Sequence, residues 1–291
     1  MPRAKQRSAV VSCTIFVISV FILMLISRCS EARGTMADAT EPPEPGIIAL
    51  MYHHLLPKAE VGRYRGNNIV TYTEDFAAQL DWLVQNGFQT VTLTDVENFL
   101  YHDTPVPARA VLITFDDGYL SNAAYAYPLL KERGMHAVVF DVTGRLSETT
   151  QAMDTKYIQM MDEQTIRSTA DVFEYASHTH DLHTFTGTGH SALTDDSKSQ
   201  IESDLSSSLS FLETVPGANL NAFSYPFGFY TRTVQQVLKD HGILLAFRAS
   251  GGVLTRQSDP YALPRYPVDT SVSMAEFERY FDAVLHPAEG E

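Results

Sequence analysis

Two adjacent acids and a downstream cluster of histidines are the side chains best suited to chemistry in this sequence. The acids are Asp116 and Asp117, and the histidines are His178, His180 and His183; each group directly follows an apolar run. Neighbouring side chains at a strand end point in different directions, so one acid can bind a metal ion while the other faces a substrate. Two imidazoles and one carboxylate leave a coordination position open for water, which is typical of a catalytic zinc-type site.

The spacing of the histidines indicates what carries them. His178 and His183 are five residues apart, and on an ideal helix this spacing would separate them by roughly 140°. We therefore expect a loop after a strand, in which His180 and Asp181 are competing ligands. Without a metal ion, the same residues would form a histidine-rich surface loop, so the histidines by themselves leave both interpretations open.

The elements that would position these residues alternate between strand and helix. Apolar runs of strand length are separated by segments in which apolar residues recur with helical spacing. The expected strands are 47–52, 89–93, 110–115, 137–142, 172–176, 221–225 and 244–249. The expected helices are 74–86, 122–133, 162–170, a longer helix capped by Thr194, 231–241 and 274–285.

This alternation predicts an α/β fold, a distorted (β/α) barrel with about seven parallel strands. An open doubly wound sheet is the alternative, although no glycine-rich phosphate loop follows the first strand. In a barrel the active site lies at the C-terminal ends of the strands, where Asp116, Asp117 and the turn Pro226–Gly228 fall. A backbone N–H in that turn could stabilise an oxyanion.

The N-terminus predicts a membrane segment. Three basic residues precede an apolar run from Ala9 to Ile26, which is just long enough to span a bilayer with the basic end in the cytoplasm. We expect residues 1–33 to be a signal-anchor, 34–46 a flexible Pro- and Glu-rich tether, and 47–291 one domain that is held at the extracellular face or secreted. Lipidation at Cys29 is disfavoured because a bulky basic residue precedes it.

Composition narrows the possible partners. The chain carries 35 acidic and 21 basic residues, a formal net charge of −14, which repels nucleic acid and other polyanions. A neutral or cationic ligand fits better, although such a surface also serves solubility. Both cysteines, Cys13 and Cys29, belong to the N-terminal region, so we expect neither a disulfide framework nor a cysteine-bound metal in the domain. No protein partner is indicated.

Over about residues 47–265, the motifs resemble those of the polysaccharide deacetylases of carbohydrate esterase family 4, the NodB-homology domain. The resemblance rests on Thr114–Gly118, which reads Thr-Phe-Asp-Asp-Gly, and on the histidine motif. The five-residue histidine spacing and the opening Leu50–His54 are similar to the branch that deacetylates the biofilm polymer poly-β-1,6-N-acetylglucosamine. The resemblance implies that residues 47–291 are a catalytic domain.

The resemblance also implies roles for the principal side chains. Asp116 would be the catalytic base, and His180 would remain a pocket residue. The implied metal ligands are Asp117, His178 and His183. Imidazole and carboxylate ligands suit zinc, with cobalt and nickel as alternatives.

The remaining motifs of the family match less fully. The proline and glycine of the third motif flank Phe227, whose N–H would take the oxyanion role, but the arginine that usually orients the base is missing there. Arg265 resembles the fourth motif and is expected to support Asp116. His286 is the candidate for the general acid of the fifth motif; without it, Asp116 could return the proton that it took.

These roles imply hydrolysis of N-acetyl groups on glucosamine units of poly-β-1,6-N-acetylglucosamine, a cell-wall glycan or a chitin-like oligomer. The water nucleophile would be activated by the metal ion. A surface-anchored carbohydrate-binding protein without catalysis is the alternative, although the retention of both aspartates and both histidines argues against it. A metal-dependent phosphoesterase would want a cationic pocket, which the acidic composition disfavours.

Overall fold

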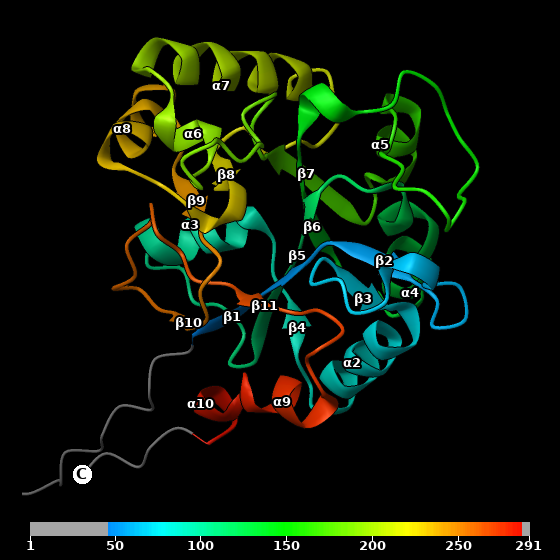
Figure 1. Ribbon diagram of the computed structural model, residues 1–291. Helices are drawn as coiled ribbons and strands as arrows, with labels where there is room; N and C mark the ends of the chain where they lie inside the picture. Colours follow the sequence, from blue (N-terminus) through cyan, green and yellow to red (C-terminus); the bar gives the residue numbers. More distant parts are fainter. Residues whose placement is uncertain (1–45, 287–291) are drawn as a thin grey trace, which may run out of the picture. The chain divides into compact units, whose positions relative to one another are not determined.

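A fully buried central strand carries the two adjacent acids. The computed structural model describes residues 46–286 (Figure 1), and β5 (Ala110–Asp117) is buried along its whole length. It pairs in parallel with β1 (Ile47–Tyr52) on one side and β6 (Ala137–Asp141) on the other. A parallel strand that is covered on both faces has a continuous apolar sequence, which explains why this segment shows no polar alternation before its acidic end.

Within residues 46–286 the main sheet has nine strands. Its order is β10-β1-β5-β6-β7-β8-β9, with β4 beside β5 and β11 beside β1, and only the pairing of β1 with β10 is antiparallel. The other bounds are β4 (Gln89–Thr90), β7 (Phe173–Ser177), β8 (Ala222–Ser224), β9 (Leu245–Phe247), β10 (Val253–Leu254) and β11 (Tyr266–Pro267). No pairing among these described strands joins β9 directly to β10. A bridge between Phe247 and Leu263 instead links β9 to the segment that enters β11, and β11 pairs with β1. The predicted barrel is therefore a half-barrel whose two sides are connected by one short segment.

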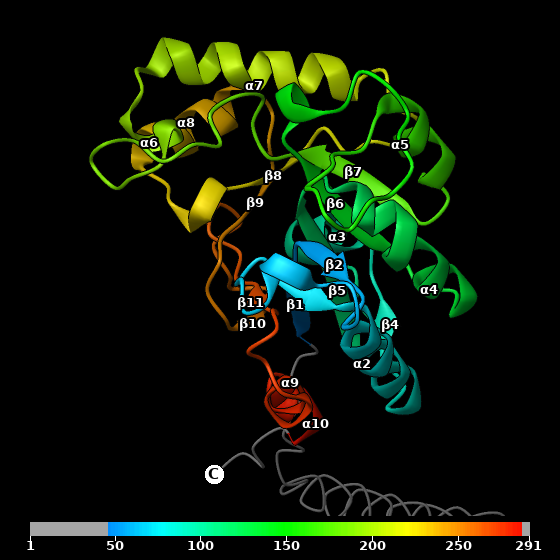
Figure 2. The ribbon, with the colours of Figure 1, turned by 45° about the vertical axis from the view of Figure 1, so that its right-hand side comes forward.

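A separate two-stranded sheet and a set of helices complete the described part of the chain. The small sheet pairs β2 (His54–Leu56) with β3 (Val70–Tyr72). The α-helices are α2 (Thr73–Gln85), α3 (Leu93–Tyr101), α4 (Tyr127–Glu132), α5 (Glu163–Thr169), α6 (Ala192–Asp195), α7 (Lys198–Leu212), α8 (Arg232–Asp240), α9 (Met274–Arg279) and α10 (Asp282–Leu285). The short 3-10 turns are η1 (Gly62–Tyr64), η3 (Thr143–Arg145) and η4 (Pro226–Gly228), and η2 (Asn122–Ala126) is a π-turn. Figure 2 shows α2, α4 and α5 on one flank of the main sheet and α6 and α8 on the other.

Alternation along β5 divides the core and delivers one acid to the inside. Ile113 and Phe115 pack in the apolar cluster beneath the outer helices, whereas Leu112 packs in a second cluster inside the half-barrel. Side chains two residues apart share a face of a strand, so Thr114 and Asp116 continue the inner series. Asp116 therefore faces the interior at the C-terminal end of the strand, where a barrel fold concentrates chemistry.

Three features of the helices and small sheet differ from the sequence-based expectation. The prediction that Thr194 caps the long helix is wrong. Thr194 lies inside the short helix α6, which ends at Asp195, and the long helix α7 begins after Ser197. Ser197 and Gln200 form a reciprocal capping box, which provides a stronger helix start than the earlier threonine. The final expected helix is divided into α9 and α10, and neither α3 nor the small sheet was anticipated.

The N-terminal predictions fall mostly outside the described residues. The signal-anchor 1–33 and the tether 34–46, apart from Gly46, are not part of the described chain. Between residues 46 and 286, no helix combines the length and apolarity needed to cross a bilayer. The described residues belong to one compact unit, and the predicted domain boundaries stay predictions.

Candidate active site

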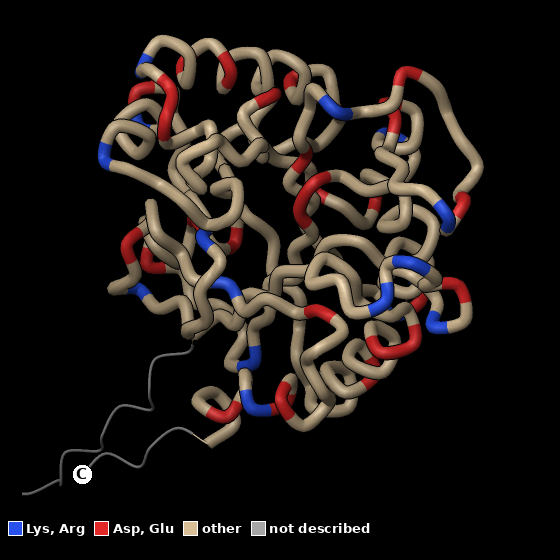
Figure 3. Tube along the Cα trace, in the orientation of Figure 1, with Lys and Arg blue, Asp and Glu red and all other residues tan. Residues whose placement is uncertain are grey.

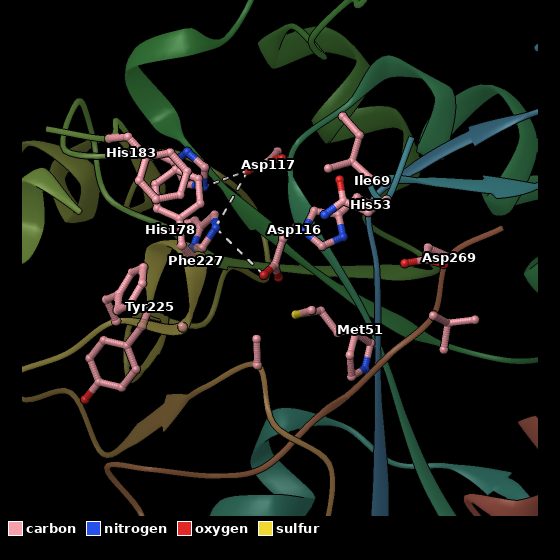
Figure 4. Close-up of a pocket in the computed structure, with 17 residues that line it drawn as sticks. Met51, His53, Ile69, Asp116, Asp117, His178, His183, Tyr225, Phe227 and Asp269 are labelled. Atoms are coloured by element: carbon pink, nitrogen blue, oxygen red, sulfur yellow. Dashed lines mark ion pairs between the residues drawn. The ribbon is translucent and has the colours of Figure 1, made fainter. Parts of the chain in front are cut away.

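A cavity of about 630 Å³ gathers the predicted site residues at the C-terminal ends of the parallel strands (Figure 4). Asp116 and Asp117 come from the end of β5, His178 and His183 from the loop after β7, and Phe227 from η4. Parallel strands bring their C-terminal ends to one edge of a sheet, so segments that lie far apart in sequence meet here. The cavity is the site that the sequence motifs predicted.

Asp117, His178 and His183 form a group that is able to hold a metal ion. Their ligand atoms all lie within 4.8 Å of one another. Oδ1 of Asp117 is 3.1 Å from Nε2 of His183 and 3.7 Å from Nε2 of His178. This oxygen is buried and has no hydrogen-bond partner among the described residues, which is costly unless a cation faces it. The donor set fits a divalent ion with an open coordination position.

Both histidines favour the neutral form that a metal ion requires. Burial lowers the pKa of His178, and burial together with the neighbouring His178 lowers the pKa of His183 to about 4. Nδ1 of His178 donates a hydrogen bond to the carbonyl of Ser224 over 2.8 Å, so its lone pair lies on Nε2, toward Asp117. An outer hydrogen bond of this kind fixes the tautomer and orientation of a metal-binding imidazole.

The chain turns sharply at the metal-binding end of β5. Asp117 has a φ of 77° and Gly118 a φ of 82°, a region that residues other than glycine seldom adopt. A side chain at Gly118 would overlap the buried carboxyl of Asp141 on the neighbouring strand. Glycine is therefore required after the second acid, and the strained turn aims Asp117 away from the direction of Asp116.

Arg265 holds the predicted base from a segment 149 residues away. Its guanidinium donates to both oxygens of Asp116, over 2.6 and 2.7 Å, and to the hydroxyls of Thr114 and Ser224 over 3.0 and 2.7 Å. Burial by itself raises the pKa of Asp116, but the guanidinium of Arg265, together with His178 and His53, holds that pKa well below its usual range. Asp116 is thus an ionised, fixed carboxylate, and Arg265 occupies the supporting position that its motif predicted.

Asp204 on α7 organises the loop between the two histidines, and no motif or spacing indicated this role. Its carboxylate accepts N–H groups from His180, Asp181 and Leu182 over 2.8, 2.6 and 3.1 Å. These bonds fix the shape of the loop that carries both histidines. His180 turns to Thr143, with Nδ1 3.0 Å from its Oγ1, and is not among the described residues that line the cavity. The expectation that His180 is a pocket residue is wrong.

A further site residue, His53, was missed by the sequence reasoning. It follows β1 and lines the cavity, and Figure 4 shows its imidazole directed toward Asp116 and Asp117. Burial raises the pKa of each carboxyl, and a positive charge on His53 opposes that effect in both. The sequence does contain an indication of this role. His53 directly follows the apolar run 47–52, which is predicted to be a strand of the same sheet as β5.

The structure does not bring His286 to the site, which corrects its expected role as general acid. His286 is exposed and follows α10. The preceding Phe281 packs 4.7 Å from Phe88, ring to ring, and Phe88 adjoins β4, which pairs with the beginning of β5. The beginning of β5 and Asp116 are separated by about 20 Å at the usual rise of a strand, so His286 lies at the opposite end of the sheet.

The turn that carries Phe227 has an unusual backbone. Phe227 has a φ of 58°, and the N–H groups of Gly228 and Phe229 are bonded to the carbonyls of Tyr225 and Pro226 over 2.9 and 3.1 Å. Gly228 has a φ of 77°, and a Cβ there would lie 3.2 Å from the backbone of Ala249. The turn is therefore tightly fixed beside the cavity, at the position where the third motif predicted an oxyanion donor.

The charges around the cavity do not form a phosphate site. Among the described residues that line it, none is Lys or Arg, and the nearby Arg265 is committed to Asp116. Figure 3 shows acidic residues on many elements of the described chain. A phosphate ester needs several cationic or backbone donors, so this arrangement favours an uncharged or cationic ligand.

Comparison with known proteins agrees with the motifs and the fold. A family profile described as polysaccharide deacetylase matches residues 103–246. A poly-β-1,6-N-acetyl-D-glucosamine N-deacetylase of Staphylococcus aureus is 26% identical over 268 residues, which cover 86% of this chain and 90% of that protein. The structure of IcaB from Ammonifex degensii aligns with a TM-score of 0.69 and 26% identity, over 81% of this chain and 97% of that one. A Streptococcus pyogenes deacetylase, PplD, has the same fold, with a TM-score of 0.69, 20% identity, and coverage of 81% and 98%.

The chain contains a domain of the polysaccharide deacetylase family, whose profile matches residues 103–246. It is an enzyme of that family, and its α/β half-barrel is the fold of these relatives. The resemblance that the Thr-Phe-Asp-Asp-Gly and histidine motifs indicated is confirmed.

Proposed function

We propose that this chain is an extracellular, metal-dependent hydrolase that removes N-acetyl groups from N-acetylglucosamine units, with poly-β-1,6-N-acetylglucosamine as the first candidate substrate and a cell-wall glycan as the second. The observation that carries the proposal is the pairing of a fixed carboxylate, Asp116, with the metal-binding group of Asp117, His178 and His183 in one cavity. The activity named for the Staphylococcus aureus relative supports the choice of polymer.

The proposed mechanism assigns one task to each residue. A divalent ion held by Asp117 and the two histidines supplies Lewis-acid activation of water and of the acetyl carbonyl when it is bound. Asp116 accepts the proton of the attacking water, while Arg265 keeps its carboxylate oriented. The N–H of Phe227 donates to the oxygen on which negative charge develops. The C–N bond then breaks, and the products are acetate and a free amine on the sugar.

The amine must receive a proton to leave, and His53 is positioned to give it. It lines the same cavity and faces the two acids, so a proton has a short path to the nitrogen of a bound acetamide. The rival donor is Asp116 itself, because a carboxyl whose pKa is depressed releases readily the proton it has accepted.

Removal of the metal ion tests the proposed function directly. We expect the full chain to release acetate from poly-β-1,6-N-acetylglucosamine, to lose this activity with a chelator, and to regain it with added Zn²⁺. β-1,4-linked N-acetylglucosamine oligomers and peptidoglycan serve as parallel substrates. Acetate release that is unaffected by the chelator would overturn the metal requirement. A chain that binds the metal ion but releases no acetate from any of the three substrates would support a carbohydrate-binding protein instead.

Substitution of His53 decides the proton donor. We expect His53→Gln to lower kcat by about 10²–10⁴-fold, the usual contribution of a general acid, with little change in metal affinity. The matched control is His286→Gln, an exposed histidine at the far end of the sheet, which should leave kcat unchanged. If His53→Gln retains wild-type kcat, Asp116 is the residue that returns the proton.

Substitution of Asp204 tests the loop that holds the histidines. We expect Asp204→Ala to weaken Zn²⁺ binding by about 10- to 100-fold, because residues that orient metal ligands typically contribute this much. Calorimetric titration of the metal-free chain measures the affinity independently of activity. Glu202→Ala on the same helix, where the carboxylate only pairs with Lys198 at 3.4 Å, is the control; equal losses in both variants would contradict a specific role.

The extracellular location rests on the sequence of the N-terminal segment. A basic flank followed by the apolar run from Ala9 to Ile26 favours a cytoplasmic N-terminus with the domain outside. Digestion of the domain by protease added to intact cells tests this orientation. Protection until the cells are lysed would place the domain inside.

A further inference from the structure

Exposed aromatic rings gather at one wall of the active-site cavity. Phe185, Phe227 and Phe229 line it, and 60%, 37% and 40% of their surfaces are exposed. Tyr230 beside them is 38% exposed, so four of the eight large apolar side chains that are exposed between residues 46 and 286 lie at this one place. We call Phe185, Phe227 and Phe229 the aromatic platform. A concentration of exposed apolar surface marks a binding site.

The platform is built outward from the metal site. The ring of Phe227 lies 4.5 Å from that of His183, and Phe185 stacks on Phe227 with ring centres 3.8 Å apart and planes inclined by 24°. Phe185 is thus the last of three successive rings that begin at His183, and it also lines the cavity. Figure 4 shows His183 and Phe227 on the side of the cavity opposite His53 and Asp269.

The backbone that carries Phe185 and Phe227 is ordered, and at Phe227 it adopts a conformation that is unfavourable for a bulky residue. Phe227 keeps a left-handed φ of 58°, which a bulky residue adopts only where the surroundings impose it. Phe185 lies on a closed loop: it bridges Ser191, and the N–H of Ala192 donates to the carbonyl of Thr184 over 2.9 Å. Both rings remain exposed despite this ordering, which is the expected arrangement for rigid binding groups.

The chemistry of the platform selects its occupant. A flat, uncharged aromatic face matches the apolar C–H face of a β-linked pyranose, and no Lys or Arg of the described chain lines the cavity to bind an anion. The platform is continuous with the reaction centre, so a ring placed on it belongs to the same chain as the reacting sugar. Pockets of this type combine aromatic walls with a few placed polar groups.

We propose that the aromatic platform is a subsite for the sugar unit next to the one being deacetylated, with Phe185 as its main contact. This inference rests on the proposed deacetylase function and adds that the enzyme reads two neighbouring units. Substrates of two or more units should therefore react with a higher kcat/KM than a minimal acetyl substrate that occupies only the reaction centre. Loss of the Phe185 ring should remove this advantage.

The test compares two substrates in one variant of the full chain. For Phe185→Ala, we expect the ratio of kcat/KM for an N-acetylglucosamine hexamer to kcat/KM for 4-nitrophenyl acetate to fall about three- to tenfold, the contribution of one aromatic stacking contact. The change should lie mainly in KM for the hexamer. Phe185→Trp should restore the ratio. Tyr157→Ala, which removes an equally exposed ring (58%) outside the cavity, should leave both rates unchanged.

Each other outcome overturns the proposal. A parallel loss for both substrates in Phe185→Ala would mean that the ring only supports His183 through Phe227. An unchanged ratio would mean that no sugar rests on Phe185. A smaller sedimentation coefficient for Phe185→Ala than for the unaltered chain would assign the platform to contact with a second copy. Failure of the proposed function is separate, because the unaltered chain would then release no acetate from any glycan.

Discussion

Replacement of Asp116 by Asn is expected to lower kcat/KM for acetate release by about 10³-fold, within the range for loss of a general base. The amide keeps the size of the side chain but cannot accept the proton of the attacking water. Because the proposed metal ligands are Asp117 and the two histidines, Zn²⁺ affinity should change far less than activity. Steady-state kinetics and calorimetric metal titration on the same preparation measure the two quantities.

The interpretation of this variant depends on its fold. Asp116→Asn leaves Arg265, which is fully buried, without its charge partner, so thermal unfolding must accompany the kinetics. A variant that binds Zn²⁺ normally below its unfolding temperature and is still inactive supports the role of Asp116 as base. Activity within a factor of ten of the unaltered chain would remove Asp116 from the mechanism.

Replacement of Arg265 by Met is expected to have the largest effect on stability, about 3–5 kcal/mol in the free energy of unfolding, because it strands a buried carboxylate. Arg265 also orients Asp116, so activity should fall with it. Arg265→Lys should recover only part of either property, since an ammonium cannot donate to both carboxylate oxygens in parallel. Chemical denaturation at pH 7 measures the loss.

The pH dependence of this loss has a definite sign. With Arg265 present, the pKa of Asp116 in the folded chain is depressed, so the pair stabilises the fold above the ordinary pKa of an aspartate and loses this effect as pH falls through the depressed value. In Arg265→Met the largest influence that opposes burial is gone, so the pKa of Asp116 in the folded chain rises. The deficit relative to the unaltered chain should therefore be larger at pH 7 than at pH 4.

Two further variants separate the buried pair from a general effect of charge. Asp116→Leu combined with Arg265→Met removes both charges, and we expect most of the stability to return while activity stays absent. Arg167→Met breaks an exposed pair with Glu163 and should change the unfolding free energy by less than about 1 kcal/mol. An equal deficit in Arg167→Met and Arg265→Met would contradict the assignment.

Much of the fold was accessible from the sequence because it is encoded locally. The strand 47–52 has the predicted bounds, and β5 extends the predicted run 110–115 by the two acids. Uninterrupted apolar runs bounded by polar turns indicate strands that are covered on both faces. The half-barrel and its order of strands depend on pairing between distant segments, and no local pattern showed that β9 would be linked to β1 through the short segment 263–267.

The proposed general acid shows where local reasoning fails. The resemblance to a family motif favours His286, yet Phe281, between α9 and α10, packs against Phe88, and β4 follows Phe88 beside the beginning of β5. His53 was passed over, although it follows the strand that pairs with β5. The local sequence does not distinguish His53 from His286. The difference between them lies in where the elements that precede them run and against which strands those elements pack.

Local sequence features indicate the kind of chemistry, because two acids at the end of a buried strand and paired histidines after another can be recognised from alternation and from the C-terminal position of active sites in such folds. The groups that complete the site come together only through the tertiary fold. Arg265 reaches Asp116 across 149 residues, Asp204 bonds the histidine loop from a helix, and the phenyl rings meet from two loops. These contacts depend on the order and register of strands, which are set by packing of the whole sheet and not by any one segment.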